Sequence, residues 1–397
     1  MFSTFVSLGN IITAAALLLS LLGASHPARS EERIKAAQVF HTYSKTFAEF
    51  DAELTEMKAR GINTIIFRVF GNPGDRIFAL ANPQTTSGVY FKTAHAPVID
   101  DLLGTVATLA HSHGMKLFAW MTTRKAVYGV DESLFDSRYD LKTRSVVRIN
   151  KLDLFNPESL SHLVALYADL AAYPIDGVLL QDDFIIKHME GAGPHAKARF
   201  ASEFMRMFEP GRMYTELELK PGGRVRRIVY TDEFWAWAKW KNRRLIEVAE
   251  VLIRTIKHNN PAIKTCLNTF YEMYLKPRNT LSWQSQNTEL ADMFDLVAVM
   301  AYHRQIMDEL GISRKEAEMV VKRVTEEAIT KHGAKKVIIK LQTIDWKKRK
   351  KIPAFELREI YKTINSVSTD VGVAFGPWEG RMDLDLNERN SRATKLR

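Results

Sequence analysis

The sequence predicts an α/β protein built as a (β/α)8 barrel, with loop and β-hairpin insertions after the third and fourth strands. Short apolar or β-branched runs alternate with longer stretches of helical period from residue 35 onward. The 397 residues, of which 46% are apolar and 26% charged, are enough for one large domain with a full core. A doubly wound open sheet is the alternative, but no glycine-rich phosphate loop follows any early strand.

The strand candidates are mostly apolar runs of six to ten residues. The eight runs, in chain order, are KAAQVF (35–40), NTIIFRVF (63–70), KLFAWM (116–121), GVLLQDD (177–183), IKTCLNT (263–269), LVAVMAY (296–302), KVIIKLQTID (336–345) and VGVAFGP (371–377). Eight strands separated by helices over about 350 residues favour a closed barrel.

Amphipathic segments between the strands predict helices, for example over 47–61, 100–114 and 158–173. Gly61 and Gly114 stand where the first two of these helices end. Asn156 and Pro157 form an N-cap followed by a proline at the first helical position.

Two connections are too long for plain loops. Residues 122–153 follow the third strand, and roughly fifty residues separate the fourth strand from a long helix over 233–257. The second connection contains two alternating arms around Lys220-Pro221-Gly222-Gly223, a pattern that predicts a β-hairpin. We expect this hairpin, 215–230, to be a flap over the mouth of the barrel.

The first thirty residues differ from the rest of the chain. The apolar run IITAAALLLSLLG and the following small residues predict a secretory signal, cut after Ser30, so that 31–397 forms the barrel domain. The n-region has no Lys or Arg, and an uncleaved membrane anchor or a buried N-terminal helix are the alternatives. We therefore expect a periplasmic or secreted protein. The sequence leaves open whether it also associates with the membrane or with the export machinery.

Charge and cysteine content exclude several classes. The net charge is +10, but the basic runs 222–227 and 346–351 are short and no nucleic-acid motif accompanies them, so we expect no nucleic-acid partner. The single Cys266 forbids an intrachain disulfide. No HExxH motif, cysteine cluster or GxSxG elbow exists, so no metal and no cofactor are expected.

Polar and aromatic residues end the predicted strands, and in a barrel these ends share one cleft. Aromatic faces stack on pyranose rings, while amides and acids bind hydroxyl groups, so the set predicts a sugar site. The candidate binding residues are Arg68, Trp120, Gln181, Asn268, Tyr271, Glu272, Tyr302, Gln342, Asp345, Trp346 and Trp378.

Asp182 and Asp183 end the fourth predicted strand and are the candidate catalytic residues. Hydrolysis of a glycosidic bond needs a carboxylic acid for the leaving oxygen and, usually, a second carboxylate. Capping of a following helix is the alternative role for this pair. Because adjacent strand residues face opposite ways, we expect the second carboxylate elsewhere; the candidates are Asp75, Glu272, Asp345 and Glu379.

A series of short motifs runs through almost all of the chain after the leader. They are GVYFKTAHAPV (88–98), KLFAWM (116–121), FNPES (155–159), DGVLLQDD (176–183), SQNTELADMFDLVAVMAY (285–302) and KLQTIDW (340–346). In these motifs and their order, the chain resembles the C-terminal glycoside-hydrolase domain of bacterial poly-β-1,6-N-acetyl-D-glucosamine N-deacetylases. The resemblance implies a (β/α)8 barrel that cleaves exopolysaccharide with Asp182 and Asp183 in its cleft, and no deacetylase activity.

The chain departs from that family at three places. Gln181 replaces a histidine before the Asp pair, Lys187 and His188 occupy the region of a further acid, and Lys340 stands where the family tends to carry Glu. The resemblance and these changes imply a hydrolase acting on an amino-sugar exopolysaccharide that is less cationic than the family's polymer, or even anionic. A non-catalytic polysaccharide-binding barrel that assists export or retention is the alternative, and a barrel acting on another small substrate is a third.

Overall fold

The computed structural model describes residues 32–223, 225–276, 286–378 and 385–387. The chain divides into two compact units, Met1–Arg33 and Ile34–Arg397, and the second holds the elements discussed below. The predicted leader, 1–30, and the candidate Glu379 lie outside the described residues. No helix within the described ranges is both long enough and apolar enough to cross a membrane.

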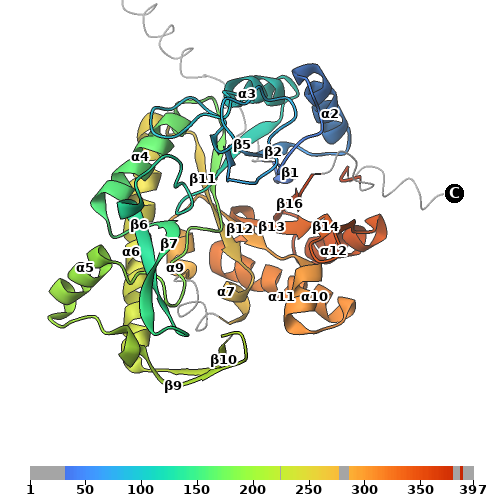
Figure 1. Cartoon of the computed structure of the whole chain (residues 1–397). Helices are drawn as coiled ribbons and strands as arrows, with labels where there is room; N and C mark the ends of the chain where they lie inside the picture. The colour runs from blue at the N-terminus through green and yellow to red at the C-terminus, as the bar shows by residue number, and fades with distance from the viewer. Residues whose placement is uncertain (1–31, 224, 277–285, 379–384, 388–397) are drawn as a thin grey trace, which may run out of the picture. The chain divides into compact units, whose positions relative to one another are not determined.

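Eight parallel strands close into a barrel, which confirms the predicted fold class (Figure 1). The barrel strands are β1 (Lys35–Val39), β2 (Thr64–Arg68), β5 (Lys116–Met121), β8 (Gly177–Leu180), β11 (Lys264–Phe270), β12 (Leu296–Met300), β13 (Val337–Gln342) and β16 (Gly372–Gly376). Each of the eight predicted strands supplies one of them. Strand β1 pairs with both β2 and β16, and this double pairing closes the ring.

Helices surround the barrel, as Figure 1 shows. They are α2 (Phe47–Ala59), α3 (Leu103–Ser112), α4 (Pro157–Ala171), α5 (Pro194–Phe204), α6 (Asp232–Asn259), α7 (Glu272–Leu275), α9 (Thr288–Asp292), α10 (His303–Leu310), α11 (Arg314–His332) and α12 (Ala354–Val367), with 3-10 turns at Glu132–Leu134, Pro210–Met213 and Ala334–Lys336. The predicted caps are present: the Asn156 side chain accepts from the N–H of Glu158, and Gly61 follows α2 with φ +85°.

The two long connections form β-hairpins. β6 (Phe135–Asp140) pairs with β7 (Ser145–Leu152) after β5, and β9 (Tyr214–Leu219) pairs with β10 (Val225–Tyr230) after β8. A Cβ on Gly223 would stand 2.6 Å from Cδ of Lys142, so the tip of the second hairpin packs against the turn of the first. Among the described residues no hydrogen bond or ion pair joins this hairpin to Asp182, and its role as a flap stays a prediction. Two further pairs of short strands, β3 (Phe70–Gly71) with β4 (Gly88–Val89) and β14 (Ile344–Asp345) with β15 (Lys350–Lys351), lie outside the barrel sheet.

The fourth strand ends earlier than its sequence indicates. The predicted strand reached residue 183, but β8 ends at Leu180, and the N–H of Phe184 closes a turn onto the carbonyl of Gln181 at 3.1 Å. Asp182 and Asp183 therefore lie on a turn, where the alternation of a strand no longer applies. Their two side chains have different surroundings, described next.

Candidate active site

Asp183 is a buried carboxylate, 6% exposed, held by the loop that follows β5. Thr122 donates its hydroxyl to Oδ2 at 2.7 Å, and Thr123 donates its hydroxyl to Oδ1 at 2.8 Å. The backbone N–H groups of Thr123 and Lys125 donate to the same carboxylate at 3.0 and 2.7 Å. Four donors occupy most of the acceptor capacity of two oxygens, so Asp183 ties the turn after β8 to the loop after β5.

Asp182 is partly exposed and lacks such anchors. Within the described ranges, no other side chain forms a hydrogen bond or ion pair with it. Burial raises the pKa of Asp182, the charge of Asp183 raises it further, and the charges of Lys340 and Lys125 oppose the shift. A carboxyl group with a raised pKa and no structural partner has the properties that general acid catalysis requires.

Lys340, on β13, donates to Oδ1 of Asn268 on β11 at 2.9 Å. Because β12 lies between these strands, both side chains point into the barrel. Burial lowers the pKa of Lys340 to about 8, although Asp182 and Cys266 raise it. The Nζ atom lies 5.9 Å from the ring centre of Tyr302. We call Asp182, Asn268, Tyr302 and Lys340 the Asp182 site.

An arc of aromatic side chains borders this end of the barrel. Neighbouring rings along the arc have centroid distances of 5.5, 4.7, 6.4 and 5.8 Å in the order Phe70, Trp120, Phe40, Trp346 and Tyr302. Phe40 and Trp346 are partly exposed, so they offer faces on which a sugar ring could stack. Trp120 donates its Nε1–H to Oε1 of Gln181, which joins the arc to the turn that carries Asp182.

The structure brings together six of the predicted residues, Trp120, Gln181, Asn268, Tyr302, Trp346 and Asp182, through these contacts. Arg68 lies nearby on β2, where its guanidinium bonds Asp75 at 3.3 Å and the carbonyl of Arg76 at 2.6 Å. The other predicted residues have separate surroundings.

Tyr271 donates its hydroxyl to Glu309 on α10 at 2.8 Å, and the neighbouring Glu272 is partly exposed. Burial raises the pKa of Glu272, and the charge of Glu309 raises it further. Neither contact reaches Asp182. These two residues form a second polar group beside the end of β11, and these contacts do not involve the Asp182 site.

Three predicted residues are occupied by local structure. Gln342 donates to the carbonyl of Ile344 at 2.8 Å and accepts from the N–H of Gln305 at 3.0 Å. Asp345 accepts the N–H groups of Lys347 and Lys348 in the turn after β14. Trp378 is 2% exposed. Their binding roles stay predictions, and none of these contacts involves the Asp182 site.

The sequence reasoning did not select Phe40, Phe70 or Tyr128. Phe40 is the last residue of the first predicted strand, so the rule applied to the other strand ends would have included it. Tyr128 donates its hydroxyl to Asn72 at 3.0 Å and comes from the long insertion after β5, where no periodic pattern marks it.

A buried ionic network supports the loops behind the Asp pair. Arg124, fully buried, pairs with Asp136 and Glu190 at 2.5 Å each, and Lys151 pairs with Glu190 at 2.6 Å. Lys241 of α6 donates to the carbonyls of Lys187 and His188 at 2.8 Å each. We call Arg124, Asp136, Lys151, Glu190 and Lys241 the Arg124 cluster. The cluster joins the β6–β7 hairpin and the loop after β8 to helix α6. These ion pairs and hydrogen bonds hold the two insertions in place against that helix.

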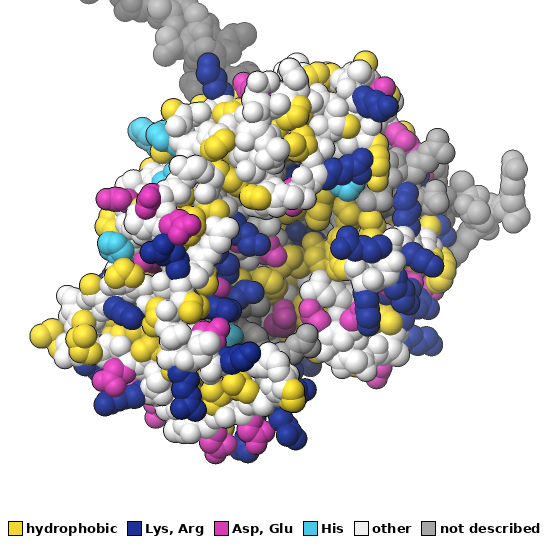
Figure 2. Space-filling model, viewed as in Figure 1, with side chains coloured by type: hydrophobic (Ala, Val, Ile, Leu, Met, Phe, Trp, Pro, Cys, Tyr) yellow, Lys and Arg dark blue, Asp and Glu magenta, His cyan; other side chains and the backbone are white. Residues whose placement is uncertain are grey.

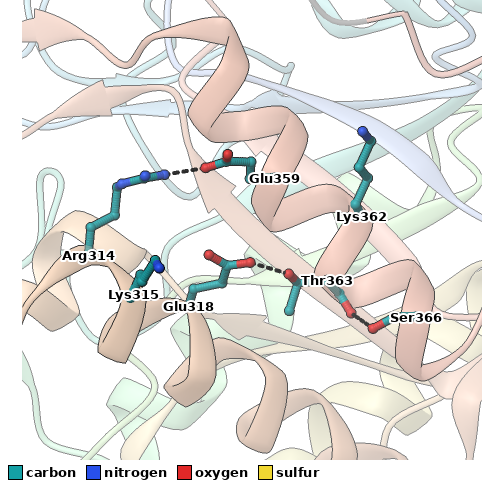
Figure 3. Close-up of a pocket in the computed structure, with 7 residues that line it drawn as sticks. All are labelled: Arg314, Lys315, Glu318, Glu359, Lys362, Thr363 and Ser366. Carbon is teal, nitrogen blue, oxygen red and sulfur yellow. Dashed lines mark hydrogen bonds and ion pairs between the residues drawn. The ribbon is translucent and has the colours of Figure 1, made fainter.

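Figure 2 shows a hollow at the centre of the face viewed in Figure 1, with hydrophobic side chains in its floor and basic side chains on its lower left rim. A second hollow lies between α11 and α12, shown in Figure 3. There Arg314 pairs with Glu359, and Thr363 donates to Glu318 at 2.5 Å. Because these charges pair with one another on the outer helices, we do not assign that hollow to the active site.

Metal-binding geometry is not found in the described ranges, where no three His, Cys, Asp or Glu side chains gather in a suitable group. His111 instead forms a hydrogen bond with Asp176, and His113 forms one with Asp51, at 2.8 Å each. Cys266 is buried, and burial raises the pKa of its thiol to about 12. Its thiol is therefore poorly suited to nucleophilic catalysis.

The fold is a (β/α)8 barrel, and the comparisons show which class of barrel it is. Residues 43–373 match the model of hypothetical glycosyl hydrolase family 13 (GHL13). The match covers most of the chain, so the chain belongs to this family and is a glycoside hydrolase by membership. A comparison with curated proteins gives no match.

Solved structures share the fold at low sequence identity. The glycoside hydrolase domain of PgaB (BpsB) from Bordetella bronchiseptica is 19% identical, with a TM-score of 0.67 over 87% of this chain and 94% of that chain. The catalytic domain of a β-amylase from Paenibacillus polymyxa is 11% identical, with a TM-score of 0.53 over 87% and 92%. A β-galactosidase from Bacillus circulans sp. alkalophilus is 11% identical, with a TM-score of 0.55 over 86% and 50%.

Proposed function

We propose that this protein hydrolyses glycosidic bonds of a bacterial exopolysaccharide made of amino sugars, of the poly-β-1,6-glucosamine type, with Asp182 as the general acid. The observation that carries the proposal is the contrast within the Asp pair. Asp183 is fixed by four donors, whereas Asp182 has a raised pKa and no side-chain hydrogen-bond partner in the described structure. Asp183 then acts as a positioning residue that holds the turn.

The second catalytic group is proposed to come from the substrate. In the described structure the charge of Asp183 raises the pKa of Asp182, but the Asp183 carboxylate is already occupied by hydrogen-bond donors. Substrates that keep an N-acetyl group can use its carbonyl oxygen as an internal nucleophile, a documented exception to the two-carboxylate rule. Lys340, close enough to lower the pKa of Asp182, would repel a cationic free amine and tolerate a neutral acetamide. These features support an acetylated polymer.

The test is release of new reducing ends from three polymers: fully N-acetylated, de-N-acetylated and uronate-containing. We expect the wild type to prefer a polymer that is not cationic. Asp182→Asn should lower turnover by about 10²–10⁴-fold, because the leaving oxygen loses its proton donor. Asp51→Asn is the matched control, since Asp51 lies on α2 and its carboxylate pairs with His113.

Two results would contradict the proposal. Undiminished turnover in Asp182→Asn would show that Asp182 is not the general acid. Polymer binding without any new reducing ends in the wild type would instead favour the non-catalytic binding barrel considered above.

We also propose that the protein acts in the periplasm or outside the cell, directed there by residues 1–30. The support is the apolar run and the small residues that follow it. Fractionation of cells expressing the full chain and a form lacking residues 2–30 provides the test. Retention of the shortened form in the cytoplasm, with export of the full chain, is the expected result.

A further inference from the structure

A separate cavity of about 340 Å³ lies between the two hairpins and the loop after β8. Arg138 and Lys142 reach it from the β6–β7 hairpin, Lys187 from the loop, and Gly223 from the tip of the β9–β10 hairpin. Its volume is at the lower end of the usual range for ligand pockets, about 300–1,000 Å³. The cavity is thus large enough for a small ligand group and is lined by three basic side chains.

The acidic groups in this cavity are already occupied. Asp140 accepts from Arg138 at 3.1 Å and from the N–H groups of Lys142 and Thr143. Glu190 is paired with Arg124 and Lys151 in the Arg124 cluster. Hydrogen bonds and neighbouring positive charges hold the pKa of both carboxyl groups below their ordinary values, against the effect of burial. Both therefore stay ionised and bound to their partners.

The basic groups are not balanced in the same way. Lys142 and Lys187 are exposed, and neither ammonium group has an ion-pair partner among the described residues. Burial lowers the pKa of His188, beside them, to about 4, and the charges of Lys241, Lys187 and Arg138 contribute to this shift. The local potential is thus positive, and an anion would be attracted to the cavity.

The walls also have apolar parts. Leu141, Met189 and Val225 line the cavity together with Tyr139, which is 9% exposed. Lysine ammonium groups beside an aromatic and aliphatic wall suit a ligand that combines an anionic group with a C–H face, as a sugar acid does. A small inorganic anion would use only the charged part.

The cavity is close to the proposed catalytic turn along the chain. Lys187 follows Asp182 by five residues, so their Cα atoms are separated by no more than about 18 Å even in extended chain. A few sugar units of one polymer can span such a distance. A polymer with one unit at Asp182 could therefore place another unit in this cavity.

The geometry points to a subsite for a carboxylate-bearing sugar unit in the cavity formed by Arg138, Lys142 and Lys187, so that the amino-sugar exopolysaccharide proposed above also carries acidic units. This inference rests on the proposed function for the identity of the polymer, but binding at the subsite does not require cleavage. The carboxylate of the sugar accepts from Lys142 and Lys187, and its ring packs against Tyr139 and the aliphatic side chains.

The experiment is isothermal titration calorimetry of the full-length Asp182→Asn protein with a uronate oligosaccharide and with the same oligosaccharide after reduction of its carboxylates to alcohols. We expect the acidic oligosaccharide to bind about tenfold more tightly, because charge-assisted hydrogen bonds are lost on reduction. Adding Lys142→Gln and Lys187→Gln should abolish the difference. Lys315→Gln, which removes an exposed charge from α11, should preserve it.

Equal affinity for the acidic and reduced oligosaccharides would overturn the inference, as would a preference that survives in the double lysine variant. Displacement of the oligosaccharide by inorganic phosphate at equal concentration would also overturn it, since the cavity would then be a simple anion site. If the charge preference is found but the wild type cleaves no polymer, the proposed hydrolysis fails and the subsite stands. If the wild type cleaves polymer but the protein shows no preference for the acidic oligosaccharide, the proposed hydrolysis stands and the subsite fails.

Discussion

The Asp182 site and the Arg124 cluster both remove charged groups from water, but they treat those charges differently. In the cluster, Arg124 has two carboxylate partners, and Glu190 has two cationic ones. In the site, Asp182 has no side-chain hydrogen-bond partner within the described ranges, and the ammonium group of Lys340 donates to a neutral amide oxygen. Charges in the cluster serve the fold, because each would be costly to bury alone.

The same contrast exists between two adjacent residues. Asp183 belongs with the satisfied groups, since threonine hydroxyls and backbone N–H groups surround it. Asp182 belongs with the groups left available for a ligand, and its raised pKa reflects that environment. The difference teaches that a paired sequence motif can divide between a structural and a chemical role.

The largest effect on stability is expected from breaking the Arg124 cluster. Arg124→Met leaves the buried Asp136 without its cation, and we expect the free energy of unfolding to fall by about 3–5 kcal/mol. Urea denaturation at pH 7 measures it. Arg148→Met is the control, because Arg148 and Glu132 are 57% and 71% exposed and such pairs contribute about 1 kcal/mol or less. Equal losses in the two variants would contradict the role of the cluster.

A smaller effect is expected from Asp183→Asn. The amide cannot accept from all four donors, so buried N–H and O–H groups lose partners, and the free energy of unfolding should fall by about 1–3 kcal/mol. Asp182→Asn should leave stability unchanged or raise it, because it removes a carboxyl group whose charged form is disfavoured by burial. Denaturation of both variants in parallel provides the test, and a destabilised Asp182→Asn with an unaffected Asp183→Asn would reverse the assignment.

The smallest expected effect is a shift of the pH profile in Lys340→Gln. A general acid must be protonated, so activity should fall as pH rises through the pKa of Asp182. The positive charge of Lys340 lowers that pKa, and its removal should move the alkaline limb of the profile to higher pH. Measurement of kcat against pH, with Lys348→Gln as an exposed-charge control, checks this. An alkaline limb that stays fixed in Lys340→Gln would show that Lys340 does not act on the acid.

The barrel could be predicted because each strand is a local apolar run with clear punctuation, and all eight runs form strands. The Asp pair could be located for the same reason, since it directly follows such a run. The predicted end of β8 was wrong by three residues. The strand stops in a turn closed by the N–H of Phe184, and such a turn leaves no periodic signal in the sequence.

The division of roles between Asp182 and Asp183 could not be predicted from the sequence. It depends on Thr122 and Thr123, which are some sixty residues earlier in the chain and meet Asp183 only because β5 and β8 are neighbours. Gln342 and Asp345 end a strand as the other candidates do, yet local backbone groups occupy them. Strand-end position therefore identifies candidates, and hydrogen-bond partners decide which remain available.

The central claim is that Asp182 protonates the leaving oxygen, and the most direct measurement compares two leaving groups. For an aryl glycoside with an acidic phenol, departure needs little protonation, whereas a sugar alcohol needs much. We predict that Asp182→Asn retains nearly wild-type kcat/KM on the activated aryl glycoside and loses about 10²–10⁴-fold on the unactivated oligosaccharide. An equal loss on both substrates would show that Asp182 acts in binding or folding and not as the general acid.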